Sequence, residues 1–267
     1  MSTNINPRPE LVERLHRGEE LIGLIVKMPN HAVLEVAGHL GFDFALIDTE
    51  HGASETDDLE NHLRAAGSAD LDVVVRVGEN SQLPVLRALD AGAKGVIVPH
   101  IDTPQDAEAA VRAAHYPPLG DRGLAASTRA GRFSTGTMAD HLERARRQTA
   151  VIVQIEDQKA VDNAFKIAAT EHVDAVWLGP GDLSMSLGFP GELDHPLVAG
   201  AIDSIVNDVR RAGNTALCVI LNHESEIPLW RERGASVFLF VAANLQAERL
   251  RDLLDGIAHP DGAGGPE

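Results

Sequence analysis

The stretch FDFALIDTEHG, residues 42–52, carries the pattern that decides the fold of this chain. An apolar run, Phe-Ala-Leu-Ile, gives way abruptly to Asp48, Thr49, Glu50 and His51. The run predicts a buried strand, and carboxylates and an imidazole at its end are costly unless they are paired or used. In α/β proteins, polar residues at the carboxyl end of a parallel strand usually line a site.

The same pattern of apolar strand and helical segment repeats along the chain. The expected strands are Leu21–Met28, Phe42–Asp48, Leu71–Val77, Gly95–Pro99, Ala150–Glu156, Val173–Leu178, Thr215–Leu221 and Val237–Val241. Strands that are apolar throughout are typical of parallel strands buried on both faces. Strands that alternate with helices within one unit of roughly 250 residues predict a single (β/α)8 TIM barrel.

A doubly wound sheet is the alternative, but it normally has a glycine-rich turn after its first strand. The segment KMPNH, residues 27–31, stands there instead, so the barrel is favoured. We expect one domain over residues 1–257, with a short N-terminal helix at Leu11–Arg17. Residues 258–267 are rich in glycine and proline and predict a flexible tail.

Charge and composition exclude several classes of partner. The chain has 23 Lys and Arg against 40 Asp and Glu, a formal net charge of -17, which argues against nucleic acid or an anionic membrane surface. A single cysteine, Cys218, fits a reducing compartment. No apolar run approaches the ~20 residues that a membrane span needs, and the N-terminus has no apolar signal segment. We therefore expect a cytoplasmic protein.

The polar residues at the predicted strand ends form the candidate site. Glu156 and Asp182 follow neighbouring strands and are expected to project into one pocket. Two adjacent carboxylates repel unless a cation or a shared proton joins them, and oxygen ligands without cysteine favour a hard divalent ion such as Mg²⁺ or Mn²⁺. A surface salt bridge is the alternative for either residue alone. Further strand-end residues are Asp48, Glu50, His51, Arg76, His100, Asp102, Gln154, Asn222 and His223.

Arg76 interrupts the apolar strand VVVRV, where an unpaired guanidinium is very costly. It either forms a structural bridge to Asp48 or Glu50, or serves as a fixed cation that stabilises negative charge on a substrate oxygen. We expect His51 to be the only histidine beside both Arg76 and the acidic cluster, which makes it the candidate general base. The histidines on helices are expected to be surface or packing residues: His16, His39, His62, His141 and His172.

Several motifs together resemble one known family. DTEHG, the strand arginine Arg76, ALDAGAKGVIVPHIDTPQDAE, YPPLGDRG, VQIE and GPGDLS occur in this order. From about Leu11 to Ile257 the chain resembles the HpcH/HpaI aldolases. These are metal-dependent class II pyruvate aldolases, which include the 4-hydroxy-2-oxoheptanedioate and 2-dehydro-3-deoxyglucarate aldolases.

The resemblance implies a divalent-metal-dependent aldolase that reversibly cleaves a 4-hydroxy-2-oxo acid. The products are an aldehyde and pyruvate, or a related 2-oxo acid, formed through a metal-stabilised pyruvate enolate. It implies Mg²⁺, Mn²⁺ or Co²⁺ as cofactor, with no Schiff-base lysine and no nucleotide. It also implies a homohexamer, a trimer of dimers, in which the last helix is exchanged between subunits.

The resemblance also implies roles for individual residues. Glu156 and Asp182 hold the metal, and Gln154 with the backbone of Gly181 and Asp182 holds the substrate. Arg76 stabilises the enolate, and His51 is the acid and base acting through water. Asp90 raises the basicity of His51, a role that rests on the resemblance alone, because the end of its helix points away from the catalytic face in an ideal barrel.

Two other functions remain as alternatives. An acyl-CoA lyase of the citrate or malyl-CoA lyase type is expected to carry extra C-terminal structure, which this chain lacks. A non-catalytic barrel scaffold predicts loss of at least one of His51, Arg76, Glu156 and Asp182, and all four are present. The aldehyde is expected to contact the polar loop 116–136, where Arg122 and Arg129 are hypothetical receptors for a distal carboxylate.

Overall fold

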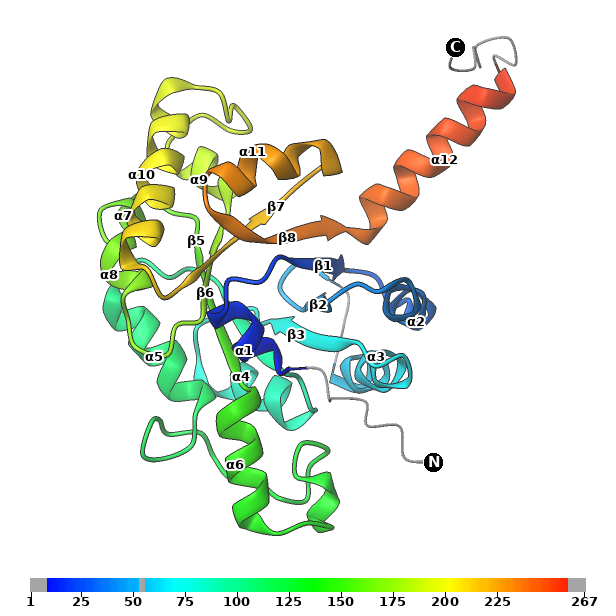
Figure 1. Ribbon diagram of the computed structural model, residues 1–267, viewed down its shortest axis with the longest axis vertical. Helices are drawn as coiled ribbons and strands as arrows, with labels where there is room; N and C mark the ends of the chain where they lie inside the picture. Colours follow the sequence, from blue (N-terminus) through cyan, green and yellow to red (C-terminus); the bar gives the residue numbers. More distant parts are fainter. Residues whose placement is uncertain (1–8, 53–55, 259–267) are drawn as a thin grey trace.

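Eight parallel strands close into a barrel in the order in which they occur along the chain (Figure 1). The computed structural model describes residues 9–52 and 56–258. The predicted (β/α)8 barrel is confirmed. The strands are β1 Leu21–Val26, β2 Phe44–Asp48, β3 Asp72–Arg76, β4 Gly95–Val98, β5 Ala150–Ile155, β6 Ala175–Leu178, β7 Ala216–Ile220 and β8 Ala235–Val241.

Helices surround the barrel and connect its strands. They are α1 Leu11–His16, α2 His31–Leu40, α3 Thr56–Ser68, α4 Gln82–Asp90, α5 Pro104–Ala114, α6 Met138–Gln148, α7 Gln158–Val161, α8 Ala164–Ala168, α9 Pro180–Ser186, α10 Pro196–Ala212, α11 Ile227–Glu232 and α12 Ala242–Ala258. Two short 3₁₀ helices, η1 Arg132–Ser134 and η2 Glu224–Glu226, complete the set within the described ranges. The predicted N-terminal helix is confirmed as α1.

One predicted helix is divided in the structure. The sequence pattern predicts a continuous helix over residues 158–170, whereas α7 ends at Val161 and α8 begins at Ala164. Asn163 lies at the break, and its side-chain amide donates to the carbonyl oxygens of Lys159 at 3.2 Å and Asp102 at 2.9 Å. Such side-chain bonds to backbone groups compete with regular helix, which accounts for the interruption.

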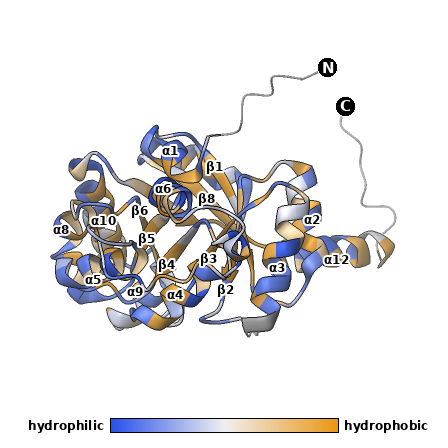
Figure 2. Ribbon diagram, turned by 90° about the horizontal axis from the view of Figure 1, so that it is seen from below, coloured by the Kyte–Doolittle hydropathy of each residue, from blue (hydrophilic) through white to orange (hydrophobic). Residues whose placement is uncertain are grey.

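The core has two layers, one inside the barrel and one between the strands and the helices. Phe44 and Leu46 of β2 point into the barrel, and α1 closes its amino-terminal end with Leu11 and Leu15. Gly23 has room for no side chain, because a Cβ there lies 2.6 Å from the Phe44 ring. Figure 2 shows the hydrophobic residues concentrated along the strands.

Strand alternation decides which polar side chains face the barrel mouth. Successive residues of a strand point to opposite faces, so every second residue shares a face. Inward-facing Leu46 is therefore followed by inward-facing Asp48, and inward-facing Val74 by Arg76. Ile152 leads in the same way to Gln154 and then to the residue after the strand, Glu156. The apolar interior of the barrel thus ends in a polar layer at its carboxyl edge.

The last helix departs from the compact barrel. Figure 1 shows α12 extending away from the rest of the molecule. Four large apolar side chains on it are exposed: Leu250, Leu253, Leu254 and Ile257. Within the described residues no helix has both the length and the apolar character to cross a membrane. The predicted tail falls outside the described residues, apart from Ala258, where α12 ends.

Candidate functional site

A buried arginine–aspartate pair lies at the mouth of the barrel. Asp48 and Arg76 stand opposite each other in the parallel register of β2 and β3. Arg76 donates from Nε to Asp48 Oδ1 at 3.0 Å and from Nη2 to Asp48 Oδ2 at 2.5 Å. The side chain of Asp48 is fully buried and that of Arg76 is 4% exposed. Charge-assisted bidentate pairing of this kind is among the strongest hydrogen-bond arrangements in proteins.

Arg76 also contacts the rest of the polar layer. Its Nη1 lies 3.0 Å from Glu50 Oε2 and donates to Gln154 Oε1 at 3.4 Å. Its guanidinium lies over the ring of Trp177, 5.0 Å from the centroid. The structural bridge suggested by the sequence is therefore present. A guanidinium has five N–H groups, two of them on Nη2, and Nη2 makes one hydrogen bond, to Asp48, so its second N–H can still meet a substrate oxygen.

Asp48 is the anchor of this layer. Burial alone raises the pKa of Asp48, but the hydrogen bonds and charge of Arg76 outweigh it and hold the pKa below its usual value. The backbone N–H groups of Glu50 and His51 both donate to Asp48 Oδ1 at 3.1 Å. Lys27 Nζ lies 3.6 Å from Asp48 Oδ2. Asp48 therefore fixes both the arginine and the start of the loop that carries His51.

The side chain of His51 is exposed at this loop. The turn after it requires glycine, because a Cβ on Gly52 lies 2.1 Å from the carbonyl oxygen of Asp48. An exposed imidazole can exchange protons with solvent. The role of His51 as the general base stays a prediction.

Glu156 is the second buried carboxylate of the layer. Its Oε1 accepts the backbone N–H of His100 at 2.9 Å, and its Oε2 accepts from Gln154 Nε2. Burial raises the pKa of Glu156, the His100 backbone bond opposes the rise, and the nearby charges of Asp182 and Glu50 add to it. A cation bound to Glu156 would therefore stabilise its ionised form.

Asp182 lies on the first turn of α9 and is exposed. The turn before it is tightly packed, because a Cβ on Gly179 lies 2.9 Å from Glu156 Cβ and 3.1 Å from Gln154 Nε2. A Cβ on Gly181, in contrast, meets nothing within 4 Å. Gly181 and Asp182 are therefore accessible, and their contact with a substrate stays a prediction.

His100 corrects one step of the sequence argument. The sequence predicts His51 as the only histidine beside both Arg76 and the acidic cluster. In the structure His100 Nε2 lies 3.1 Å from Glu50 Oε1, the carboxylate that also contacts Arg76, and its Nδ1 lies 3.0 Å from Glu156 Oε1. His100 has a φ of +57°, in the left-handed region that few residues other than glycine adopt. The sequence places it at a strand end, but spacing alone does not reveal that it bridges two carboxylates.

Asp90 and Arg122 lie at the opposite edge of the barrel. Asp90 ends α4, just before β4 begins, and its Oδ1 accepts from Arg122 Nη2 at 2.7 Å. Arg122 is buried, and its guanidinium lies over the Tyr116 ring, 4.6 Å from the centroid. The hydrogen bonds found among the described residues do not join Asp90 to His51. Arg122 is committed to Asp90, so it is not free to receive a distal carboxylate.

Two sets of side chains have the chemistry to hold a metal ion. Glu156 and Asp182 offer oxygen ligands at the barrel mouth, and the raised pKa of Glu156 fits a pair that a divalent cation completes. His31, Asp58 and His62 on α2 and α3 offer a mixed set, with one ligand atom of each within 4.8 Å of the others.

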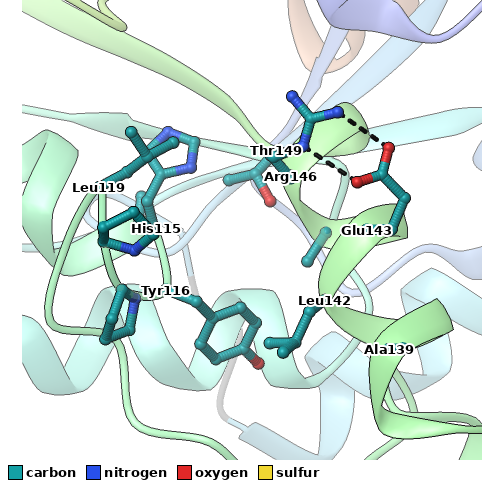
Figure 3. Close-up of a pocket in the computed structure, with 12 residues that line it drawn as sticks. His115, Tyr116, Leu119, Ala139, Leu142, Glu143, Arg146 and Thr149 are labelled. Carbon is teal, nitrogen blue, oxygen red and sulfur yellow. Dashed lines mark hydrogen bonds and ion pairs between the residues drawn. The ribbon is translucent and has the colours of Figure 1, made fainter.

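A separate hollow of about 290 Å³ lies between the end of α5 and helix α6 (Figure 3). It is lined by His115, Tyr116, Leu119 and Leu142, and the ion pair of Arg146 with Glu143 borders it (Figure 3). Its lining includes Thr149, the residue before β5, which places it toward the amino-terminal edge. It contains none of the strand-end residues.

The chain matches known proteins over most of its length. The family model for HpcH/HpaI aldolase/citrate lyase matches residues 21–240. A 2-keto-3-deoxy-L-rhamnonate aldolase from Escherichia coli (strain K12) is 35% identical over 246 residues, 91% of this chain and 89% of that protein. A hydroxypyruvate/pyruvate aldolase from Agrobacterium fabrum is 36% identical over 242 residues, 90% of each chain. An HpcH/HpaI aldolase/citrate lyase family protein from Burkholderia cenocepacia J2315 has a similar crystal structure, with a TM-score of 0.88, 35% identity and coverage of 93% and 98%.

Proposed function

Because the chain belongs to the HpcH/HpaI aldolase/citrate lyase family, we propose that this aldolase cleaves a 4-hydroxy-2-oxo acid reversibly into an aldehyde and pyruvate or a related 2-oxo acid. The observation that carries the proposal is the polar layer at the barrel mouth. There a buried, fixed arginine with one remaining N–H lies beside the carboxylate Glu156 and the exposed turn at Asp182. This is an arrangement for stabilising negative charge on a bound oxo acid.

Glu156 and Asp182 are the residues that we propose to hold a divalent ion, Mg²⁺, Mn²⁺ or Co²⁺. Oxygen ligands of this kind suit hard cations, and two carboxylates leave coordination positions for a ligand and water. When bound, the ion supplies Lewis-acid polarisation of the 2-oxo group. This chemistry needs no Schiff-base lysine, and Lys27, the lysine that follows β1, is paired with Asp48 instead.

The chain's own groups bind the substrate and move its protons. Gln154 and the backbone N–H groups of Gly181 and Asp182 orient the oxo acid. His51, acting through water, takes the proton of the 4-hydroxyl group, and the bond between C3 and C4 breaks to leave an aldehyde and the enolate of pyruvate. Arg76 stabilises the enolate oxygen through its remaining N–H. His51 then returns the proton to C3, so that atoms and charges balance.

The relatives favour this proposal over the alternatives. The two proteins named above are an aldolase for a deoxy sugar acid and an aldolase for hydroxypyruvate and pyruvate. Neither name points to an acyl-CoA substrate. A non-catalytic scaffold has no need for the costly buried charges of Arg76, Asp48 and Glu156. Pyruvate and hydroxypyruvate are accordingly the two donors to test first.

We also propose that the protein is a homo-oligomer, a hexamer built as a trimer of dimers. The extension of α12 away from the barrel supports exchange of this helix between subunits (Figure 1). Its exposed apolar side chains, Leu250, Leu253, Leu254 and Ile257, supply surface for such a contact. Light scattering of the whole chain, compared with a chain that ends at residue 241, tests this.

Proton exchange at C3 of the donor tests the reaction directly. Pyruvate or hydroxypyruvate is incubated in D₂O with the protein and Mg²⁺, Mn²⁺ or Co²⁺, and loss of the C3 proton signal is followed by NMR. We expect exchange that stops on addition of EDTA and that is lost in Glu156→Gln. Exchange that survives EDTA contradicts the metal-dependent mechanism. A panel of aldehydes, added to the exchanging enzyme, then identifies the acceptor.

A further inference from the structure

A second group of possible metal ligands lies on α2 and α3, outside the strand-end cluster. These two helices pack side by side on the outside of the barrel (Figures 1 and 2). His31 is the first residue of α2, while Asp58 and His62 are one turn apart on α3. Helices that follow strands of a barrel begin at its carboxyl edge. The group therefore belongs to the same end of the molecule as the site, on its outer ring.

The three side chains are already in contact. His31 Nε2 lies 3.1 Å from Asp58 Oδ1. His62 Nδ1 lies 2.8 Å from the backbone carbonyl oxygen of Asp58 and 3.6 Å from Asp58 Oδ2. The two imidazole rings are 4.5 Å apart between centroids and tilted by 53°. One nitrogen or oxygen of each residue lies within 4.8 Å of the others, a spacing close to that of ligands around one small ion.

Two polar atoms in this group have no hydrogen-bond partner. His62 is fully buried, and its Nε2 is one of these atoms; the other is Asp58 Oδ2. The carbonyl oxygen of Asp58 can only accept a hydrogen bond, so His62 Nδ1 carries the hydrogen and Nε2 keeps a free lone pair. A buried polar atom without a partner costs about 1–3 kcal/mol. Hydrogen bonding within the protein therefore leaves the group incomplete.

We propose that His31, Asp58 and His62 form a second metal site, distinct from Glu156 and Asp182, that takes Zn²⁺ or a similar transition-metal ion. Two imidazoles and one carboxylate are a ligand set that Zn²⁺ uses, whereas carboxylates alone suit Mg²⁺ and Mn²⁺. The bond from His62 to the backbone carbonyl is the outer contact that metal-binding histidines usually make. The partly exposed side chain of His31 leaves the site open to solvent for a fourth ligand.

The ion ties the first residue of α2 to the first turns of α3. Helix α3 is the next helix of the chain after β2, so the ion fixes its first turns at the carboxyl edge of the barrel. Ligand binding to the folded chain alone stabilises it by mass action, and a ligand that joins two helices raises the melting temperature. The proposal thus concerns stability at the catalytic edge and is independent of which substrate the aldolase takes.

Zinc titration of the chelator-treated full chain tests the proposal. Saturating Mg²⁺ is present throughout to occupy the carboxylate pair, and Zn²⁺ binding is measured by calorimetry and by the melting temperature. The variants are His31→Asn and His62→Gln. The matched control is His39→Asn, which replaces an exposed histidine on the same helix as His31. Co²⁺ absorption provides a spectroscopic signature of nitrogen ligands.

We expect the wild type and His39→Asn to bind one Zn²⁺ in the presence of Mg²⁺ and to melt at a higher temperature with it. The two ligand variants are expected to bind at least about tenfold more weakly, since even outer contacts of a metal site cost that much. Equal binding by His31→Asn and His39→Asn overturns the proposal. So does a Zn²⁺ site that is lost in Glu156→Gln and kept in His31→Asn, because that site is the carboxylate pair. His31 lies at the protein surface, so its variant remains informative if His62→Gln fails to fold.

Discussion

Two of the arginine–aspartate pairs among the described residues lie at opposite edges of the barrel. Arg76 and Asp48 meet at the carboxyl edge, and Arg122 and Asp90 meet near the amino-terminal edge. Both arginines are nearly inaccessible, and each lies over an aromatic ring, Trp177 in the first pair and Tyr116 in the second. Their geometry differs: Arg76 binds Asp48 through two hydrogen bonds, whereas Arg122 makes one, from Nη2 to Asp90 Oδ1.

Their surroundings differ. Around Arg76 further ionisable groups converge: Glu50 contacts its guanidinium, Lys27 contacts Asp48, and His100 bridges Glu50 and Glu156. Beside Arg122 lie Tyr116 and His141: the Tyr116 hydroxyl lies 3.0 Å from His141 Nε2, and burial lowers the pKa of His141. The first pair can stabilise charge that develops on a ligand. The second joins loop 116–136 to α4, where the backbone of Asp90 also accepts from Ala130 N–H at 3.1 Å.

Replacement of each arginine by lysine gives the largest expected effect. Lysine keeps the charge but cannot reproduce the guanidinium's hydrogen bonds, two to Asp48 from Arg76 and one to Asp90 from Arg122. Arg76→Lys and Arg122→Lys are therefore both expected to lower the free energy of unfolding, by about 1–3 kcal/mol for the hydrogen bonds lost. Only Arg76→Lys is expected to slow donor proton exchange, by roughly 10²–10³-fold in kcat. Urea unfolding and the exchange assay measure the two quantities separately.

The comparison breaks if Arg122→Lys slows exchange as much as Arg76→Lys while remaining stable. That result would give Arg122 the substrate contact that the sequence suggested and the structure argues against. If both variants lose stability and only Arg76→Lys loses exchange activity, the carboxyl edge has the catalytic role and the amino-terminal edge a structural one.

The next effect concerns the proton carrier. His51→Asn removes an exposed side chain, so we expect unchanged stability and a loss of roughly 10²–10⁴-fold in kcat. Asp90→Asn is expected to do the reverse. Its carboxylate is the partner of a buried arginine, so the variant should be less stable, while the acidic limb of its pH–rate profile stays at the wild-type pH. A profile whose acidic limb moves to lower pH in Asp90→Asn supports instead the role in raising the basicity of His51.

The sequence predicts the barrel and the strand ends because both follow from the spacing of apolar residues and from the alternation of strands and helices along the chain. Strand alternation also explains why Asp48, Arg76, Gln154 and Glu156 share the inner face. Contacts between elements distant in the chain are not encoded in this way. The bridge made by His100 depends on a left-handed backbone at one residue, and the group at His31, Asp58 and His62 depends on the packing of α2 against α3.

The loop 116–136 shows the same limit. Its composition predicts a functional loop, and its arginines suggest receptors for an anionic substrate. In the structure the side chain of Arg122, within this loop, is buried, and η1 at Arg132–Ser134 consists of three consecutive residues with positive φ. Charge in a sequence does not tell whether the side chain faces solvent or a partner, because that depends on tertiary packing.

The smallest effect at neutral pH belongs to His115 in the hollow of Figure 3, near Arg122. Burial lowers the pKa of His115 from its ordinary value of 6.5 to about 4. Between these values the unfolded chain binds a proton that the folded chain excludes, so stability falls as the pH falls from 6.5 to 4. At about 1.4 kcal/mol per pH unit, the loss amounts to roughly 3 kcal/mol at pH 4.

His115→Gln is therefore expected to reduce the difference in unfolding free energy between pH 7 and pH 4 by roughly 3 kcal/mol, with exchange activity at pH 7 unchanged. The lowered pKa of Asp48 and the raised pKa of Glu156 act equally in both proteins, so the difference between them isolates His115. Arg146→Ala, at the rim of the same hollow, is the control and is expected to keep the wild-type pH dependence, because its ion pair with Glu143 is exposed. A His115→Gln protein that loses stability in acid as steeply as the wild type would show that protonation of His115 is not what destabilises the fold. The contrast between the carboxyl edge and the amino-terminal edge would then fail.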